Sequence, residues 1–120
     1  MHRFSRYVAV GAVATAVHYA VLVLAVEVAG WPAVVGSGLG AVVGAQVAFF
    51  GNRRFTFGHR GAVGPAWLKF QGTAVLGALF GMAVVAAGVR ADLHYLLAQV
   101  VATVATVVLT FAINRAWAFR

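Results

Sequence analysis

Two short stretches of the sequence combine arginine, asparagine and aromatic residues, which are side chains that bind phosphate and pack against rings. The first runs from Phe49 to Phe57, and the second runs from Phe111 to Phe119, 62 residues later. Both fit the pattern F-x-x-N-R-x-[F/W]-[T/A]-F, and each follows a long apolar run. A guanidinium group presents a planar fork of donors that suits phosphate oxygens. The repeated pattern is therefore a candidate phosphate site.

We expect the polar and aromatic residues of the two copies to have different tasks. The polar residues are the predicted phosphate-binding set: Asn52, Arg53, Asn114 and Arg115. The aromatic residues are predicted to flank the substrate: Phe55, Phe57, Trp117 and Phe119. The alternative is that asparagine caps a helix, arginine satisfies the last carbonyls, and the aromatics form an interfacial belt. Both interpretations stay open, although anchoring alone does not require asparagine before arginine twice.

Three polar side chains lie inside the apolar runs and are predicted to line a polar groove beside the substrate. His18 is near the middle of the first run, Thr15 is one turn earlier on the same face, and Gln46 precedes the first motif. An ionisable residue at that depth in a membrane is costly and points to function, such as contact with a polar headgroup or proton transfer. Alternatively, His18 and Gln46 hydrogen-bond neighbouring helices and hold the bundle together.

The sequence lacks the residue combinations that catalysis usually needs. Its two carboxylates, Glu27 and Asp92, both fall at the ends of apolar runs, and there is no cysteine. Neither acid–base chemistry by paired carboxylates nor a metal site has the residues it needs, and no phosphate-cradling glycine loop occurs. We therefore predict no enzyme activity, no catalytic residues, no metal and no cofactor.

Composition indicates how these residues are held. Hydrophobic residues make up 63% of the 120 residues and charged residues only 9%, whereas soluble domains carry roughly a quarter charged residues. Four intervals contain no Asp, Glu, Lys or Arg: 7–26, 28–52, 70–89 and 93–114. About 20 apolar residues span a membrane as a helix. We predict an all-α membrane protein with four transmembrane helices, at about 7–29, 33–52, 67–89 and 93–114.

The distribution of positive charge predicts the topology. Eight of the nine basic residues fall on one side of a four-pass arrangement, and only Arg90 falls on the other. By the positive-inside rule, both termini are in the cytoplasm. The same placement argues that the net charge of +7 does not reflect binding to nucleic acid.

Small residues recur along the second and fourth helices at the spacing of the two motifs. Gly36, Gly40 and Gly44 recur every four residues, which favours close packing of helices. The positions 62 residues later are Ala98, Ala102 and Thr106, and Thr110 continues the stripe. We predict one four-helix domain, 1–120, built as two parallel-repeat hairpins of about 7–57 and 67–119. The two motifs then face the same leaflet. Phe80 is the residue at the same offset from His18, so the halves are not equivalent.

The chain resembles the GtrA-like family of small four-helix membrane proteins over nearly its whole length. The resemblance rests on Gly11-x-x-x-Thr15-x-x-His18, the 49–57 motif, Tyr95-Leu96-Leu97-Ala98-Gln99 and the closing motif at 114–119. One departure is Ala118, where the first copy has Thr56. The resemblance implies a role in cell-surface polysaccharide synthesis. It implies either translocation of polyprenyl-phosphate-linked sugars, such as undecaprenyl-phosphate hexose, or recruitment of a glycosyltransferase.

We therefore predict a multi-pass flippase of the bacterial inner membrane that carries a polyprenyl-phosphate-sugar lipid to the outer leaflet. The Asn-Arg pairs would collect the phosphate, and the aromatic and polar residues would contact the sugar. The expected assembly is a homodimer packed through glycine faces, with a glycosyltransferase as a possible partner. The alternatives are a scaffold that docks a glycosyltransferase and a small multidrug-type exporter. The exporter ranks low because Glu27 lies at the outer end of the first helix.

Overall fold

The computed structural model describes residues 2–51, 54 and 64–118 of the chain. These residues form four long helices, and no strand occurs among them. Helix α1 is His2–Val23 and continues as a short π-helix, η1, over Leu24–Val28. The others are α2 (Ala33–Gly51), α3 (Gly64–Arg90) and α4 (Tyr95–Ala118). The predicted all-α class with four helices is confirmed; α2 matches its predicted bounds within one residue, while those of the other helices, with η1 counted as part of α1, differ by up to five residues.

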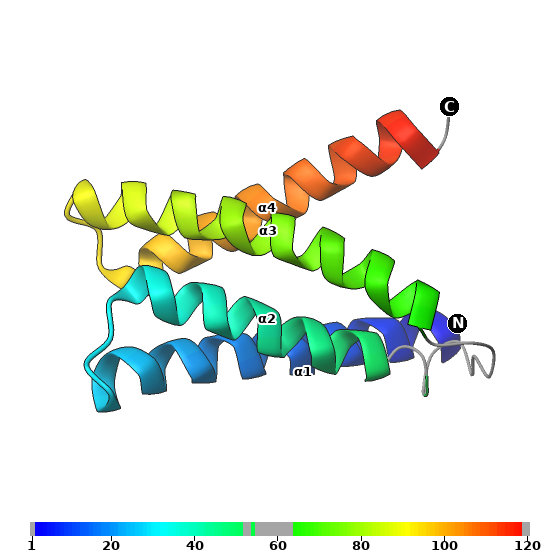
Figure 1. Ribbon diagram of the computed structural model, residues 1–120, viewed down its shortest axis with the longest axis horizontal. Coiled ribbons are helices and arrows are strands. Elements are labelled where there is room, and N and C mark those ends of the chain that lie inside the picture. Colours follow the sequence, from blue (N-terminus) through cyan, green and yellow to red (C-terminus); the bar gives the residue numbers. More distant parts are fainter. Residues whose placement is uncertain (1, 52–53, 55–63, 119–120) are drawn as a thin grey trace.

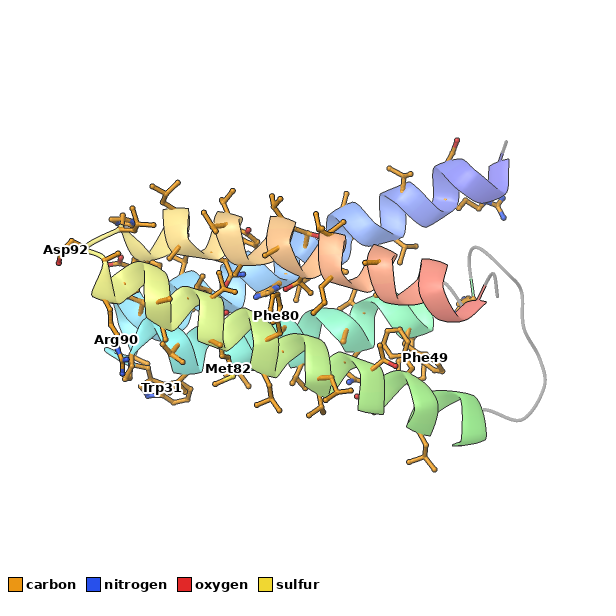
Figure 2. All side chains as sticks on the ribbon, turned by 90° about the horizontal axis from the view of Figure 1, so that it is seen from above. Trp31, Phe49, Phe80, Met82, Arg90 and Asp92 are labelled. Carbon is orange, nitrogen blue, oxygen red and sulfur yellow. The ribbon has the colours of Figure 1, made fainter. Side chains whose placement is uncertain are left out.

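The helices form two antiparallel hairpins, α1–α2 and α3–α4, which contact each other through α2 and α3. Figure 1 shows both chain ends on one side of the bundle and both hairpin turns on the other. We call these sides the terminal end and the turn end. Trp31, Arg90 and Asp92 lie at the turn end, and Phe49 lies toward the terminal end (Figure 2).

Each hairpin turn depends on one residue with left-handed backbone geometry. Gly30 has φ +70° and follows η1, where the Trp31 amide donates to the carbonyl of Ala25 at 2.9 Å. Asp92 has φ 66° after α3, and aspartate is one of the few side chains that tolerate this region. The Leu93 and Asp92 amides return to carbonyls of the last turn of α3, each at 3.0 Å. This is the Schellman pattern that ends many helices.

Three of the helices are long and apolar enough to cross a membrane. The candidate spans among the described residues are Val8–Val28, Ala33–Gly51 and Phe70–Arg90, and a shorter apolar stretch covers Tyr95–Leu109. Large apolar side chains point outward along all four helices, as Figure 2 shows for the whole bundle. The chain is therefore a membrane protein with several apolar helices. The orientation with both termini in the cytoplasm stays a prediction.

The glycine stripe of α2 packs against α1. A Cβ atom on Gly36 would lie 3.1 Å from the Ala25 Cβ, and one on Gly40 would lie 2.5 Å from the carbonyl oxygen of His18. A Cβ on Gly44 would lie 2.9 Å from the carbonyl oxygen of Ala14. The stripe thus permits the close backbone approach that supports helix association in lipid. Because this face is used within the chain, a homodimer would have to use other surfaces.

The second hairpin also packs through a small residue, but here the glycine lies on the first helix of the hairpin, α3, and not on the second. Ala98, the counterpart of Gly36, contacts α3 at Gly88, where an added Cβ would lie 2.8 Å from the Ala98 Cβ. Ala98 also forms the buried core near the turn end with Val85 and Ala102. Gly88 lies 63 residues after Ala25, so the first arms match at an offset of 63 and the second arms at 62.

This offset changes the counterpart of His18. At 63 residues it is Gly81, which is buried, rather than the Phe80 that a constant offset of 62 predicts. One half of the interior therefore carries an imidazole ring where the other half carries no side chain.

Candidate functional site

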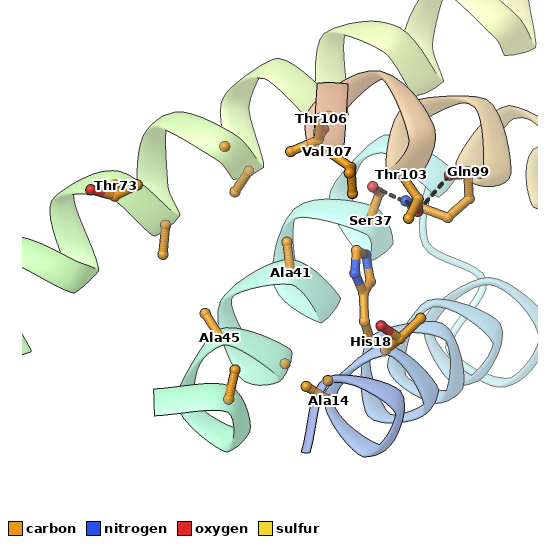
Figure 3. A pocket seen from close by; sticks show the side chains of 18 of the residues that line it. Ala14, His18, Ser37, Ala41, Ala45, Thr73, Gln99, Thr103, Thr106 and Val107 are labelled. Carbon is orange, nitrogen blue, oxygen red and sulfur yellow. Dashed lines mark hydrogen bonds between the residues drawn. The ribbon is translucent and has the colours of Figure 1, made fainter. Parts of the chain in front are cut away.

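A partly open cavity of about 380 Å³ lies between the four helices, and all four contribute residues to its wall. Most of the wall is made by glycine and alanine, which leave the space open (Figure 3). Seven of the lining residues carry polar side chains: Thr15, His18, Ser37, Thr73, Gln99, Thr103 and Thr106. The lining residues lie in the central parts of the helices and extend on toward the terminal end. The cavity thus has a mostly apolar wall that carries seven polar side chains, within helices that are apolar outside.

A hydrogen-bonded network forms the wall of the cavity nearest the turn end. The Ser37 hydroxyl on α2 donates to Gln99 Oε1 on α4 at 2.5 Å, and both residues are only 2% exposed. Gln99 Nε2 donates to the Thr103 hydroxyl at 3.3 Å, and the Tyr19 hydroxyl on α1 lies 2.7 Å from the same oxygen. Four side chains thereby join α1, α2 and α4. Ser37 and Gln99 also occupy equivalent positions of the predicted repeat, so their contact fits an axis that passes between them.

His18 stands beside this network and has an unsatisfied atom. Its side chain rises from α1 toward Ser37 in Figure 3, and its ring centroid is 5.5 Å from that of Tyr19. The Nε2 atom is buried and makes no hydrogen bond within the part of the chain that the structure describes. Buried polar atoms are nearly always paired, and an unpaired one needs an explanation. His18 therefore has unused hydrogen-bonding capacity next to the cavity.

The other two residues predicted to line the groove, Thr15 and Gln46, lie in different places. Thr15 lines the cavity with His18, as their spacing predicts. Gln46 is not among the lining residues and instead pairs with Gln71 on α3 through two amide hydrogen bonds of 2.6 and 3.1 Å. This is the helix-to-helix contact that the sequence left open as an alternative. A role for Gln46 beside the substrate stays a prediction without a contact that supports it.

Most side chains of the two Asn-Arg motifs lie outside the part of the chain that the structure describes. Asn52, Arg53, Phe55, Phe57 and Phe119 lie outside the described residues. Three further motif residues lie on the last turns of α4, but their side chains are also outside the description: Asn114, Arg115 and Trp117. Phe49 opens the first motif and packs on Phe70 of α3, with ring centroids 5.2 Å apart. Convergence of the motifs on one phosphate stays a prediction.

A second hollow lies between α1 and α2 at the terminal end. It has a volume of about 500 Å³ and a largely apolar wall that includes Val10, Val13 and Val47. Arg6 and Arg54 also line it. Guanidinium groups beside an apolar channel suit a lipid that carries a phosphate. The hollow uses residues of α1 that face away from the polar cavity, so the two spaces are separate.

Sequence reasoning missed most of the polar wall. Five cavity residues were not predicted: Ser37, Thr73, Gln99, Thr103 and Thr106. Serine and threonine give little signal, since they are tolerated in membrane helices as packing residues. Gln99 could have been found, because the offset of 62 pairs it with Ser37 and a strongly polar side chain there needs a partner.

The chemistry of the cavity is that of hydroxyl, amide and imidazole groups without fixed charge. No Asp, Glu, Lys or Arg is among its lining residues. Within the described ranges, no three His, Asp or Glu side chains gather as a possible metal site. Such a wall can exchange hydrogen bonds with a hydroxyl-rich, uncharged group. It offers no pairing for a buried charge, which would be costly at that depth.

Closure of the bundle differs between its ends. At the turn end, the Tyr95 hydroxyl of α4 donates to Glu27 Oε1 of η1 at 2.8 Å and joins the two hairpins. Toward the terminal end, α4 diverges from α1, as Figure 1 shows. The cavity is therefore closed by side-chain contacts on its turn side and lies between separating helices on its terminal side.

Comparison with known proteins identifies one family. No curated protein and no solved structure matches the chain. The sequence profile of one family, described as the GtrA/DPMS transmembrane domain, matches residues 6–120, which include all of α2, α3 and α4 and nearly all of α1. The chain belongs to the GtrA/DPMS transmembrane-domain family.

Proposed function

We propose that this protein is a flippase that carries a polyprenyl-phosphate-linked sugar across a bacterial inner membrane for the synthesis of cell-surface polysaccharide. Family membership connects the chain with translocation of polyprenyl-phosphate sugars at the family level. The observation that carries the proposal is the cavity between four apolar helices, whose wall carries hydroxyl, amide and imidazole side chains. The energetics of moving a sugar explain why such a cavity matters.

A sugar headgroup cannot cross hydrocarbon easily because its hydroxyl groups lose their hydrogen bonds to water. Moving one hydroxyl group into a medium without hydrogen-bond partners costs roughly 4–8 kcal/mol, and a hexose carries several. The cavity offers partners from all four helices, among them Thr15, His18 and Thr106, which lie in the central parts of α1 and α4. Its volume of about 380 Å³ is near the lower end of small-molecule sites, ~300–1,000 Å³. It suits one monosaccharide better than a longer glycan.

The phosphate and the prenyl tail need other surfaces. We assign the phosphate to the Asn-Arg pairs at 52–53 and 114–115, whose side chains would meet at the terminal end of the bundle. The tail stays in lipid beside the apolar outer faces of the helices. Movement needs no nucleotide in this scheme, so its direction depends on substrate supply and product removal. A glycosyltransferase that loads the lipid is the natural partner, and a homodimer would thicken the wall.

Reconstitution tests the proposal against the scaffold alternative. The purified protein is placed in lipid vesicles with a polyprenyl-phosphate-hexose, and the fraction of lipid accessible from outside is followed with time. We expect faster equilibration of this lipid between the leaflets than in empty vesicles. Equal rates with and without protein would contradict the flippase proposal and favour a scaffold that recruits a glycosyltransferase. That scaffold would then be tested by co-purification.

A further inference from the structure

Two glycines of α3 line the cavity although helix packing does not require them. A Cβ atom on Gly77 would meet nothing closer than Thr106 Cγ2 at 3.8 Å, and one on Gly81 nothing closer than Thr106 Oγ1 at 3.7 Å. These are ordinary van der Waals distances, so alanine would fit at either position. Glycine within a helix is less stable than alanine because it loses more backbone freedom on folding. Packing alone therefore gives no reason for glycine at these two positions.

The other helix glycines that meet a neighbouring helix show what a packing role looks like. An added Cβ would lie 2.5 Å from Met82 Sδ at Gly38, 2.5 Å from a carbonyl oxygen at Gly40 and 2.8 Å from the Ala98 Cβ at Gly88. A larger residue at any of these positions would push a helix or a side chain aside. Gly77 and Gly81 differ from them because an added Cβ would make only ordinary contacts with Thr106, and both glycines border the cavity.

Comparison of the two hairpins shows why the cavity lies beside Gly77 and Gly81. At the offset of 63, Gly77 corresponds to Ala14 and Gly81 corresponds to His18. In the first hairpin, the His18 ring fills the interior and packs on Gly40. In the second hairpin, the equivalent position has no side chain, and the face of α3 that lines the cavity continues with Thr73, Ala74 and Ala78. The cavity thus occupies the place that a second large side chain would fill.

We propose that Gly77 and Gly81 are specificity-determining residues that set the largest sugar the cavity accepts. This rests on the function proposed above and concerns the size of the headgroup. The glycines bound the space from α3, opposite the His18 ring, and they contribute no hydrogen-bonding group themselves. Their effect is therefore on volume alone, which separates them from the hydroxyl, amide and imidazole groups of the wall.

The expected changes follow from volume. A carbon atom added to the wall takes about the share of one water molecule in the liquid, ~30 Å³. Gly81→Ala adds one such atom and removes a small part of the cavity. The double variant Gly77→Val with Gly81→Val adds six, which removes roughly half of it. This larger loss of cavity volume should slow lipids with large headgroups more than lipids with small ones.

The test measures initial translocation rates of the full chain in vesicles for three polyprenyl-phosphate lipids that carry a pentose, a hexose or an N-acetylhexosamine. For the double valine variant, we expect at least a tenfold fall for the largest headgroup that the wild type moves. The rate for the smallest should stay within threefold. Gly81→Ala should slow the largest headgroup most and the smallest least, with smaller changes in rate. It replaces the double variant in the test if that variant inserts poorly into the membrane.

Two controls on α3 add carbon atoms away from the cavity: Ala83→Val adds two, and Gly72→Ala adds one, as Gly81→Ala does. Ala83→Val lies on an exposed part of the helix, and Gly72→Ala meets no atom within 4 Å; both should leave all three rates unchanged. An equal fall for all three headgroups, or no change in any, would overturn the size limit while the transport function stands. A wild type that moves none of the three lipids would overturn the proposed function itself.

Discussion

Gln99 is the centre of the only side-chain network that joins α1, α2 and α4 among the described residues, so its removal gives a quantitative test of the structure. Gln99→Leu keeps the approximate size of the side chain but removes the acceptor of the Ser37 hydroxyl and the donor to Thr103. Ser37 is 2% exposed, so its hydroxyl cannot turn to solvent. The variant leaves a buried donor without this partner.

The size of the effect follows from this burial. An unsatisfied buried polar group costs about 1–3 kcal/mol. Hydrogen bonds between membrane helices average ~0.6 kcal/mol and reach ~1.7, because the unfolded helices also find partners in the membrane. We therefore expect Gln99→Leu to lower the free energy of unfolding by about 1–2 kcal/mol. Adding Ser37→Ala removes the unpaired hydroxyl and should recover part of this loss, with a coupling energy of about 0.5–1.5 kcal/mol.

The assay is reversible unfolding in mixed detergent micelles of the wild type, the two single variants and the double variant. Helix content followed against the fraction of denaturing detergent gives the four free energies. Effects that add within ~0.3 kcal/mol would show that the Ser37 and Gln99 side chains do not interact. That result would refute the network and the approach of α2 to α4 on which the closed side of the cavity depends.

Three further predictions concern packing, the Gln46 pair and the phosphate site. Gly40→Ala places a Cβ 2.5 Å from a carbonyl oxygen of α1 and should destabilise the protein by about 1–3 kcal/mol in the same assay, whereas Gly72→Ala should not. Gln46→Leu should lower stability by up to about 1.7 kcal/mol through loss of its amide partner on α3. Its transport rate in vesicles should stay within twofold, and a selective loss of transport would instead place Gln46 beside the substrate. Arg53→Ala should weaken binding of a polyprenyl phosphate, measured by tryptophan fluorescence, at least fivefold more than Arg60→Ala. Equal effects would indicate general interfacial charge.

The helices could be predicted because each apolar run is bounded by charge. The intervals from Arg6 to Glu27 and from Lys69 to Arg90 contain no charged residue, and helices cover them in the structure. The glycine stripe of α2 was predictable for the same kind of reason, since a spacing of four residues puts small side chains on one face. What the stripe packs against was not predictable, because the rotation of each helix depends on contacts with all its neighbours.

The interior of the bundle was only partly predictable. His18 stood out because an ionisable group inside an apolar run is rare and costly. The correspondence of Gly81 with His18 was not predicted, because it depends on a one-residue difference in offset between the two hairpins. Gln46 and Gln99 look alike in sequence, yet one pairs across the α2–α3 contact and the other lies in the cavity wall. Only the direction of each side chain separates them.

The central claim is that the sugar crosses the membrane through the cavity between the four helices and hydrogen-bonds to its polar side chains. Thr106→Val tests it directly, because the change replaces a hydroxyl group of the cavity wall by a methyl group and nearly preserves shape. The initial rate for a polyprenyl-phosphate-hexose in vesicles is compared among the wild type, Thr106→Val and Thr106→Ser, which restores the hydroxyl. We predict a rate for the wild type well above that of empty vesicles, a fall of at least threefold for valine, and recovery with serine. A rate with valine equal to that of the wild type would contradict a route through the cavity.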